Sequence, residues 1–383
     1  MKIGFDHQAF AMQSYGGISR YVVALATHLK QLQQSIRVVA PIHRNRYVRD
    51  LPDGTFVGRE LNAFPPKSGR LIARWNRAAT TCDFKRWKPD LVHETYYAYR
   101  SSAPRSTPTV VTVHDMTHEK FPESFNRFDE SAAMKRAAVA RADHVICISE
   151  STKRDLIELL GTPDEKISTV YHGYDDLPND GPIIDVARER PYLLYVGSRA
   201  SYKNFSGLLR AVAASPRLKR DFCVIAFGGG ALTGEERSLM ARLGLGDDQV
   251  LAVRGEDASL GAYYTHARAF VYPSRYEGFG LPPLEAMAND CPVITSNSSS
   301  LPEVVANAGV YFSPDDVEQM SHVIESTVYN DATLAELRTL GRERLTHFSW
   351  TQCAEDTLNA YRRVLGEHTA PPGRETCPSR QTA

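Results

Sequence analysis

The sequence predicts an α/β protein of two domains, each built on a parallel β-sheet. A chain of 383 residues is long for one domain and suits two of ordinary size. Short apolar runs alternate with helical patterns, which is typical of parallel α/β layers. This alternation stops at residues 176–190, which are rich in Pro, Asp and Gly, and then begins again. We therefore expect domains at residues 1–175 and 191–345, joined by a linker.

The first half begins with a strand at residues 2–5, followed by a glycine turn at residues 14–21 that opens a helix. Gly16 and Gly17 in this turn let the backbone approach an anion or a sugar, because a helix N-terminus presents free N–H groups. The turn lacks GxGxxG, so a dinucleotide fingerprint is absent. Further strands are expected at residues 37–40, 91–94, 110–115, 144–149 and 168–171, with a helix at residues 129–142.

Two strands of this half end in polar residues, at the edge where parallel sheets place their chemistry. His114 is followed by Asp115, and His93 by Glu94. Each histidine is either a functional side chain or one satisfied by its surroundings, and both readings stay open. His114 is our candidate for the site.

The second half repeats the opening of the first, which predicts two Rossmann-like domains that face each other across a cleft. A strand at residues 192–196 is followed by a turn that contains Gly197, Arg199 and Lys203, and a helix begins at residue 205. The two cations stand where the turn meets the helix, so they suit a ligand with two phosphates. The alternative is that they are ordinary surface charges.

Later strands are expected at residues 222–227, 250–253, 269–272, 292–295 and 309–312. Exposed backbone at Gly255, after the second of these, could lie against a base or ribose. Residues 317–365 read as largely helical, and we expect the last part, 346–365, to return to the N-terminal domain. The tail at residues 366–383 is rich in Pro, Thr, Ser and Arg, which predicts disorder.

The stretch at residues 274–287 is the most informative in the chain. It follows a buried strand and enters a helix expected to start at Pro282 or Pro283. Gly278 and Gly280 permit close backbone approach, and the next turn offers N–H groups to a diphosphate. Glu277 and Glu285 bracket this cradle and can accept hydrogen bonds from the hydroxyl groups of one extended ligand. Alternatively, they are a solvated loop acid and a first-turn acid that complements the helix dipole.

Charge and composition exclude some classes of protein. The formal net charge is zero, so a globally basic nucleic-acid binder is not expected. In the first hundred residues, however, bases outnumber acids by roughly two to one, most densely at residues 44–88. Trp75, Phe84 and Trp87 lie among these charges, so the region is either a solvated surface or a contact with an anionic membrane.

The cysteines indicate a reducing compartment. All six lack CxxC spacing, which suits free thiols and argues against a cysteine zinc site. No signal-peptide core and no run of eighteen apolar residues occurs. We expect a cytoplasmic protein, with any membrane contact peripheral and at the inner face of the plasma membrane.

Taken together, five segments resemble one family. The E-x7-E segment at residues 277–287 looks like the donor-site signature of the GT-B retaining glycosyltransferases of family 4, also called group 1. Residues 15–21, 113–115, 195–205 and 291–305 are similar to companion segments of that family. Ser198 and Tyr202 depart from it, since many members carry arginine there.

The resemblance implies a role for each matching position. Glu285 would hold the nucleotide ribose and Glu277 the donor hexose, while the amides of Phe279, Gly280 and Leu281 would meet the sugar and the distal phosphate. Lys203 and Arg199 would neutralise the diphosphate leaving group. Gly16 and Gly17 would approach the phosphate from the other domain, and His114 would lie beside the transferred sugar.

The expected activity is a retaining, metal-independent hexosyl transfer from a nucleotide sugar, with no further cofactor. GDP-mannose or a GDP-deoxyhexose is the expected donor, since the chain resembles mannosyltransferase-like members. The acceptor would be a lipid-linked or growing surface glycan, as in lipopolysaccharide O-antigen or exopolysaccharide biosynthesis. Two alternatives are a GT-B nucleotide-sugar epimerase and a non-catalytic partner subunit that binds sugar or membrane.

Overall fold

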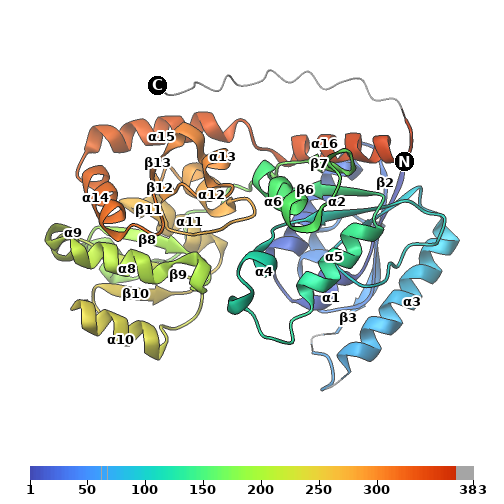
Figure 1. Ribbon diagram of the computed structural model, residues 1–383, viewed down its shortest axis with the longest axis horizontal. Coiled ribbons are helices and arrows are strands. Elements are labelled where there is room, and N and C mark those ends of the chain that lie inside the picture. Colours follow the sequence, from blue (N-terminus) through green and yellow to red (C-terminus); the bar gives the residue numbers. More distant parts are fainter. Residues whose placement is uncertain (62, 67, 368–383) are drawn as a thin grey trace.

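The computed structural model describes residues 1–61, 63–66 and 68–367. Two α/β lobes lie side by side, with the N-terminal half on the right of Figure 1 and the C-terminal half on the left. This is the two-domain α/β architecture that the sequence predicts. Lys67 of the basic region, and residues 368–383 of the tail expected to be disordered, lie outside the described residues.

Within the described residues, the first sheet is parallel and has the strand order β3-β2-β1-β4-β5-β6-β7. Its strands are β1 (Lys2–Phe5), β2 (Ser35–His43), β3 (Phe56–Glu60), β4 (Leu91–Glu94), β5 (Thr109–Val113), β6 (His144–Cys147) and β7 (Ile167–Thr169). The helices of this half are α1 (Gln8–Met12), α2 (Gly17–Gln31), α3 (Gly69–Trp87), α4 (Thr117–Lys120), α5 (Ser131–Arg141) and α6 (Glu150–Leu160).

The second sheet is also parallel, with the order β10-β9-β8-β11-β12-β13 in the described chain. Its strands are β8 (Tyr192–Val196), β9 (Cys223–Phe227), β10 (Val250–Val253), β11 (Ala269–Tyr272), β12 (Val293–Ser296) and β13 (Gly309–Phe312). The helices are α7 (Asp185–Glu189), α8 (Phe205–Ala214), α9 (Pro216–Asp221), α10 (Gly234–Leu243), α11 (Asp257–His266), α12 (Leu281–Ala288), α13 (Leu301–Val305), α14 (Val317–Val328), α15 (Asp331–Leu345) and α16 (Trp350–Val364). Short 3-10 turns are η1 (Tyr47–Asp50), η2 (Pro122–Ser124), η3 (Asp164–Lys166), η4 (Ser201–Lys203) and η5 (Ala306–Ala308).

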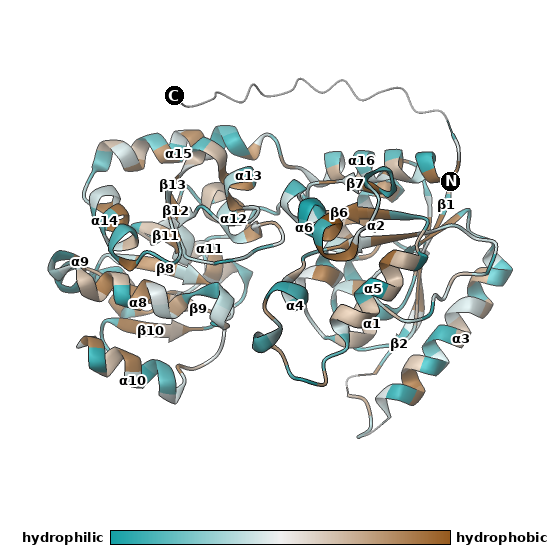
Figure 2. Ribbon diagram, viewed as in Figure 1, coloured by the Kyte–Doolittle hydropathy of each residue, from teal (hydrophilic) through white to brown (hydrophobic). Residues whose placement is uncertain are grey.

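Both sheets are apolar where helices cover them. Strands β4, β5, β8, β9 and β11 are buried throughout, as expected for strands packed on both faces. Figure 2 shows the same division, with hydrophobic residues along the strands and hydrophilic residues on the outer faces of many helices. The carboxyl ends of both sheets are therefore held rigidly, and the loops that follow them carry the site.

Helix α16 leaves the C-terminal lobe and lies over the N-terminal one (Figure 1). Its buried face, which includes Trp350, Leu358 and Tyr361, belongs to the same core as helix α2. The Tyr361 hydroxyl is 2.5 Å from His93 Nδ1, and His93 Nε2 is 2.9 Å from Thr112 Oγ1. Burial lowers the pKa of His93 to about 3, so the ring is neutral and joins α16 to the sheet. His93 is thus a structural residue. This agrees with the second of the two interpretations of the sequence, in which its surroundings satisfy the ring.

Several elements differ from the sequence-based expectations. Helix α12 begins at Leu281, so both prolines lie inside its first turn. The region predicted as a linker contains the short helix α7. Helix α3 occupies the last part of the basic region, where no helix was expected.

Candidate active site

The loop between β11 and α12 carries the first part of the site. Gly280, with φ +122°, directly precedes the helix, in a conformation that favours glycine. Neither the Phe279 nor the Gly280 amide donates to another described residue. These N–H groups lie at the positive end of a helix dipole, which suits an anionic ligand.

Lys203 and Glu277 form a close pair beside this loop. The Lys203 Nζ is 2.7 Å from both carboxylate oxygens of Glu277 and 3.3 Å from the Tyr272 hydroxyl. Only 16% of the lysine side chain and 11% of the glutamate side chain are exposed. The ammonium group is therefore fixed before any ligand arrives, within a part of the site that excludes most water.

A serine loop supports Glu277 from behind. The Glu277 N–H donates to Ser299 Oγ at 2.8 Å, and the Ser300 hydroxyl donates to the carbonyls of Glu277 and Phe279 at 2.9 and 2.6 Å. This loop follows β12 and belongs to the Cys291–Val305 segment, to which the sequence assigned no role of its own. Its hydroxyl groups fix the backbone of the glycine-bearing loop.

Glu285 lies on α12 and faces the N-terminal domain. Tyr264 donates to its Oε2 at 3.3 Å. Burial raises the pKa of Glu285, and the nearby positive charge of Arg20 partly offsets this effect. Arg20 comes from α2 of the other domain, where it pairs with Asp175 at 2.9 Å. The sequence contains Arg20 in the matching segment 15–21, but its part in the site was not predicted.

The Arg199 side chain makes hydrogen bonds that stabilise the fold. Its Nε is 2.7 Å from Glu236 Oε1, and its other nitrogens donate to the carbonyls of Gly228, Gly230 and Ala231. Only 4% of the side chain is exposed. The guanidinium group therefore holds the glycine turn after β9, so these contacts disfavour Arg199 as a second cation for a diphosphate. Its catalytic role stays a prediction.

In the N-terminal domain, Gly16 and Gly17 stand at the start of α2. Gly16 caps α2, and a Cβ there would lie 1.6 Å from the Gln13 side chain. A Cβ at Gly17 would meet nothing within 4 Å. Gly17 therefore borders open space at the start of a long helix, where a ligand can approach the backbone.

His114 lies where the two domains touch. A Cβ at Gly278 would be 1.8 Å from the His114 carbonyl oxygen, so only glycine permits this approach. The His114 N–H donates to the Tyr97 hydroxyl at 3.2 Å. Burial lowers the pKa of His114 to about 4, so its ring is neutral at physiological pH. The buried Lys135 supports the following turn by donating to the Asp115 carbonyl at 2.8 Å.

A second histidine, His172, was not predicted. It is 3% exposed, and its ring centroid is 4.5 Å from Tyr21, 5.3 Å from Phe279 and 6.0 Å from His114. Burial and the neighbouring His114 hold the pKa of His172 well below its usual range. The sequence signal was only a histidine after the last strand of the first half. The neutral ring joins the two domains beside the predicted site.

The remaining glycines divide into two kinds. Gly197, with φ +127° and open space around a would-be Cβ, follows β8 and can admit a ligand. Gly255 precedes α11, where a Cβ would lie 2.6 Å from the Ser259 Cβ. Tight packing accounts for the glycine at 255. Its contact with a nucleotide stays a prediction.

The domains meet around the predicted donor loop. The side chains of Ser149, which caps α6, and of Thr152 within α6 donate to the Gly278 carbonyl at 2.7 and 3.1 Å. The Met116 N–H donates to the Tyr276 hydroxyl at 3.0 Å. Residues of the N-terminal half thus pack directly against the loop between β11 and α12.

Comparison with known proteins identifies this arrangement. The model described as Glycosyltransferase Family 4 matches residues 15–176, and that described as Glycosyl transferases group 1 matches residues 181–344. The chain belongs to the glycosyltransferases of family 4, also called group 1. Its fold is GT-B, and it is a hexosyltransferase.

Relatives cover nearly the whole glycosyltransferase. It is 29% identical over 373 residues to the O-antigen chain mannosyltransferase B of Escherichia coli, covering 90% of this chain and 96% of the relative. It is 26% identical to the alpha-maltose-1-phosphate synthase of Mycolicibacterium smegmatis, covering 95% and 100%. The solved sucrose-phosphate synthase of Thermosynechococcus elongatus shares the fold, with TM-score 0.73, 22% identity and coverage of 95% and 99%.

Two further observations bear on binding. Among the described residues, no group of three His, Cys, Asp or Glu side chains is placed to hold a metal ion. None of the described helices is both long and apolar enough to cross a bilayer.

Proposed function

We propose that this glycosyltransferase moves a mannosyl or related deoxyhexosyl group from a GDP-linked donor to a lipid-linked or growing surface glycan, with retention of configuration. The observation that carries the proposal is the arrangement of Lys203 and Glu277 beside the free amides of the glycine-bearing loop. The mannosyl donor is supported by the named activity of the 29% identical relative.

In the proposed mechanism, the bond between the sugar C1 and the phosphate oxygen breaks and negative charge builds on the departing diphosphate. The Lys203 ammonium and the amides of Phe279 and Gly280 stabilise that charge in a site that excludes most water. The acceptor oxygen bonds to C1 on the same face, and its proton passes to the departing phosphate oxygen. This route gives retention. It assigns the neutralisation of charge to a lysine and helix-terminal amides, so no metal enters it.

Each carboxylate has a separate part in this proposal. Glu277 orients Lys203 and accepts hydrogen bonds from the hexose hydroxyl groups, while Glu285 accepts from the ribose. Gly16 and Gly17 border the phosphate, and the neutral His114 lies beside the sugar that moves. Arg20, which neighbours Glu285, supplies a cation from the N-terminal domain.

We place the reaction in the cytoplasm, at the inner face of the plasma membrane. Helix α3 exposes 71% of Leu71 and 60% of Trp75 among its arginines and lysines. Exposed apolar side chains beside cations suit an anionic lipid surface. Binding to anionic and to neutral vesicles tests this contact. Equal binding to both would argue against it.

The function is tested by a donor screen and a turnover assay. GDP-, UDP-, ADP- and dTDP-sugars are compared by thermal shift, because a bound ligand raises stability in proportion to ln(1 + [L]/Kd). With the donor so found, Lys203→Ala and Glu277→Ala should each lower kcat by roughly 100-fold or more. Near wild-type transfer by both variants would refute the site. Acceptor-independent release of nucleotide together with an isomerised sugar would indicate an epimerase instead.

A further inference from the structure

A groove in the N-terminal domain has no part in the donor site. One hollow, of 390 Å³, includes Arg74, Arg77 and Arg100 in its wall. A second, of 330 Å³, includes Met12, Phe64, Ile72 and Tyr96. The two hollows share five lining residues, namely His7, Gln8, Ala73, Tyr97 and Met134. They therefore adjoin as one groove along helix α3, which we call the α3 groove. Three arginines line one end, and mainly apolar side chains together with Arg44 line the other.

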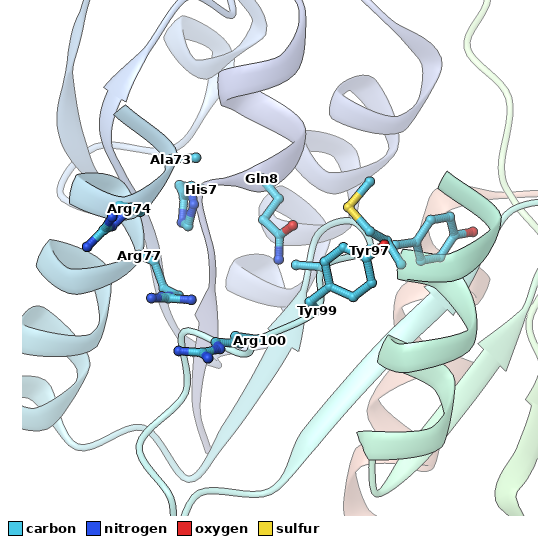
Figure 3. A pocket seen from close by; sticks show the side chains of 10 residues that line it. His7, Gln8, Ala73, Arg74, Arg77, Tyr97, Tyr99 and Arg100 are labelled. Carbon is cyan, nitrogen blue, oxygen red and sulfur yellow. The ribbon is translucent and has the colours of Figure 1, made fainter. Parts of the chain in front are cut away.

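The cationic end is built from two separate parts of the chain. Arg74 and Arg77 stand on α3, whose Asn76 is fixed to both backbone groups of Ile42 at 2.9 and 2.8 Å. Arg100 comes from the loop after β4, and Arg77 and Arg100 extend into the same hollow below His7 (Figure 3). Helix and loop thus bring these charges together on a rigid base.

In the part of the chain that the structure describes, the three arginines of the groove form no ion pair. Within residues 1–61, 63–66 and 68–367, none of Arg74, Arg77 and Arg100 lies within ion-pair distance of an Asp or Glu. Arg44, at the apolar end, differs because it donates to the carbonyls of Ala11 and Met12. Like charges in one hollow repel each other, and an anion removes that repulsion. The planar guanidinium group matches a phosphate in two-pronged geometry.

The inner wall of the groove is also the support of the active site. The Tyr97 ring lines both hollows, and its hydroxyl accepts the His114 N–H at 3.2 Å. Met134 lines both as well, and its neighbour Lys135 holds the Asp115 carbonyl. A ligand in the α3 groove is thus separated by one layer of side chains from the residue beside the transferred sugar.

We propose that the α3 groove binds the phosphate or diphosphate of a lipid-linked acceptor, with Arg74, Arg77 and Arg100 on the phosphate and the apolar end against the first part of the lipid chain. This inference rests on the proposed function, because it names the acceptor of that transfer. An amphiphilic occupant follows from charge complementarity at one end and from the apolar lining at the other.

Farnesyl diphosphate is a suitable probe, because it combines a diphosphate with a short apolar chain. Calorimetry should show that the wild-type protein binds it more tightly than inorganic diphosphate or farnesol. The Arg77→Ala/Arg100→Ala double variant should bind it about 10-fold to 100-fold more weakly, since each lost arginine removes charge-assisted hydrogen bonds. Arg86→Ala is the matched control, since it removes one exposed charge from α3 outside the groove and should bind as the wild type does.

Three results would overturn the inference. Unchanged binding by the double variant would place the probe elsewhere. Equal affinity for inorganic diphosphate would indicate a free phosphate site without a lipid subsite. A loss of binding in Lys203→Ala, rather than in the double variant, would place the probe in the donor site.

Kinetics separate this inference from the proposed function. With a lipid-diphosphate acceptor, the double variant should show an acceptor KM raised about 10-fold or more, while donor KM and the donor thermal shift stay as in the wild type. If the wild-type enzyme transfers no sugar, the proposed function fails and the calorimetric result still decides the groove. If it transfers sugar and the double variant keeps the wild-type acceptor KM, the groove assignment fails alone.

Discussion

The Glu303 side chain caps a helix of the opposite domain, and its removal should weaken the contact between the two domains beside the active site. Its carboxylate accepts the N–H groups of Glu150 and Ser151 at 2.6 and 3.1 Å, across the domain boundary. These are the first two amides of α6, and they would otherwise lack a partner within the helix. The third amide, of Thr152, bonds to Ser149 Oγ at 3.0 Å within its own domain. Glu303→Ala therefore removes only the bonds between domains.

The size of the effect follows from these two bonds. A carboxylate at a helix N-terminus with two charge-assisted hydrogen bonds is worth about 2 kcal/mol when partly exposed. The equilibrium between joined and separated domains should then shift roughly 30-fold toward separation. Ser149 and Thr152 of the same helix hold the Gly278 carbonyl, so donor kcat/KM should fall as well.

Hydrogen exchange measures this directly. In Glu303→Ala, the amides of Glu150 and Ser151 should exchange faster by a factor approaching roughly 30, while that of Thr152 changes less. Glu158→Ala removes an exposed carboxylate from the same helix and should leave all three unchanged. Wild-type exchange at Glu150 and Ser151 in Glu303→Ala would refute the reasoning.

Three further predictions concern close approach and pH. Gly278→Ala should destabilise the joined domains by roughly 1–3 kcal/mol, because the new Cβ would meet the His114 carbonyl at 1.8 Å. Gly17→Ala should leave the melting temperature unchanged yet weaken donor binding, and the reverse pattern would contradict our placement of the phosphate. Burial raises the pKa of Glu285, and the ionised form accepts the ribose hydroxyls, so donor affinity should fall as the pH drops through that raised pKa. Glu285→Gln should bind weakly with little dependence on pH in that range, and a wild-type pH profile would count against the assignment.

Much of the fold could be predicted because buried parallel strands have a strong local signature. The strands at residues 2–5, 91–94, 192–196, 250–253, 269–272 and 309–312 have the predicted bounds, since each is a short apolar run between polar turns. Helix α3 was missed because arginines and lysines interrupt its apolar pattern. Its Arg70, Arg74 and Arg77 nevertheless share one face at spacings of four and three, which could have indicated a helix.

The site was predictable where backbone geometry demands particular residues. Gly278 and Gly280 stand in the sequence where the structure needs close approach and a positive φ. Contacts between distant segments were not predictable. Arg199 and Lys203 lie four residues apart in one turn. Arg199 nevertheless donates to the Gly228 carbonyl, whereas Lys203 pairs with Glu277. His172 carried no local signal beyond its position after the last strand of the first half, because its contacts form only when the two domains pack.

The division of labour between the two carboxylates is the central claim, and one kinetic comparison tests it most directly. Donor Kd and kcat should be measured for Glu277→Ala and Glu285→Ala, with the donor that the thermal-shift screen identifies. We predict that Glu277→Ala lowers kcat by about 100-fold or more with little change in donor Kd. We predict that Glu285→Ala mainly raises donor Kd, by about 10-fold or more. Equal effects of the two variants on both quantities would contradict the account.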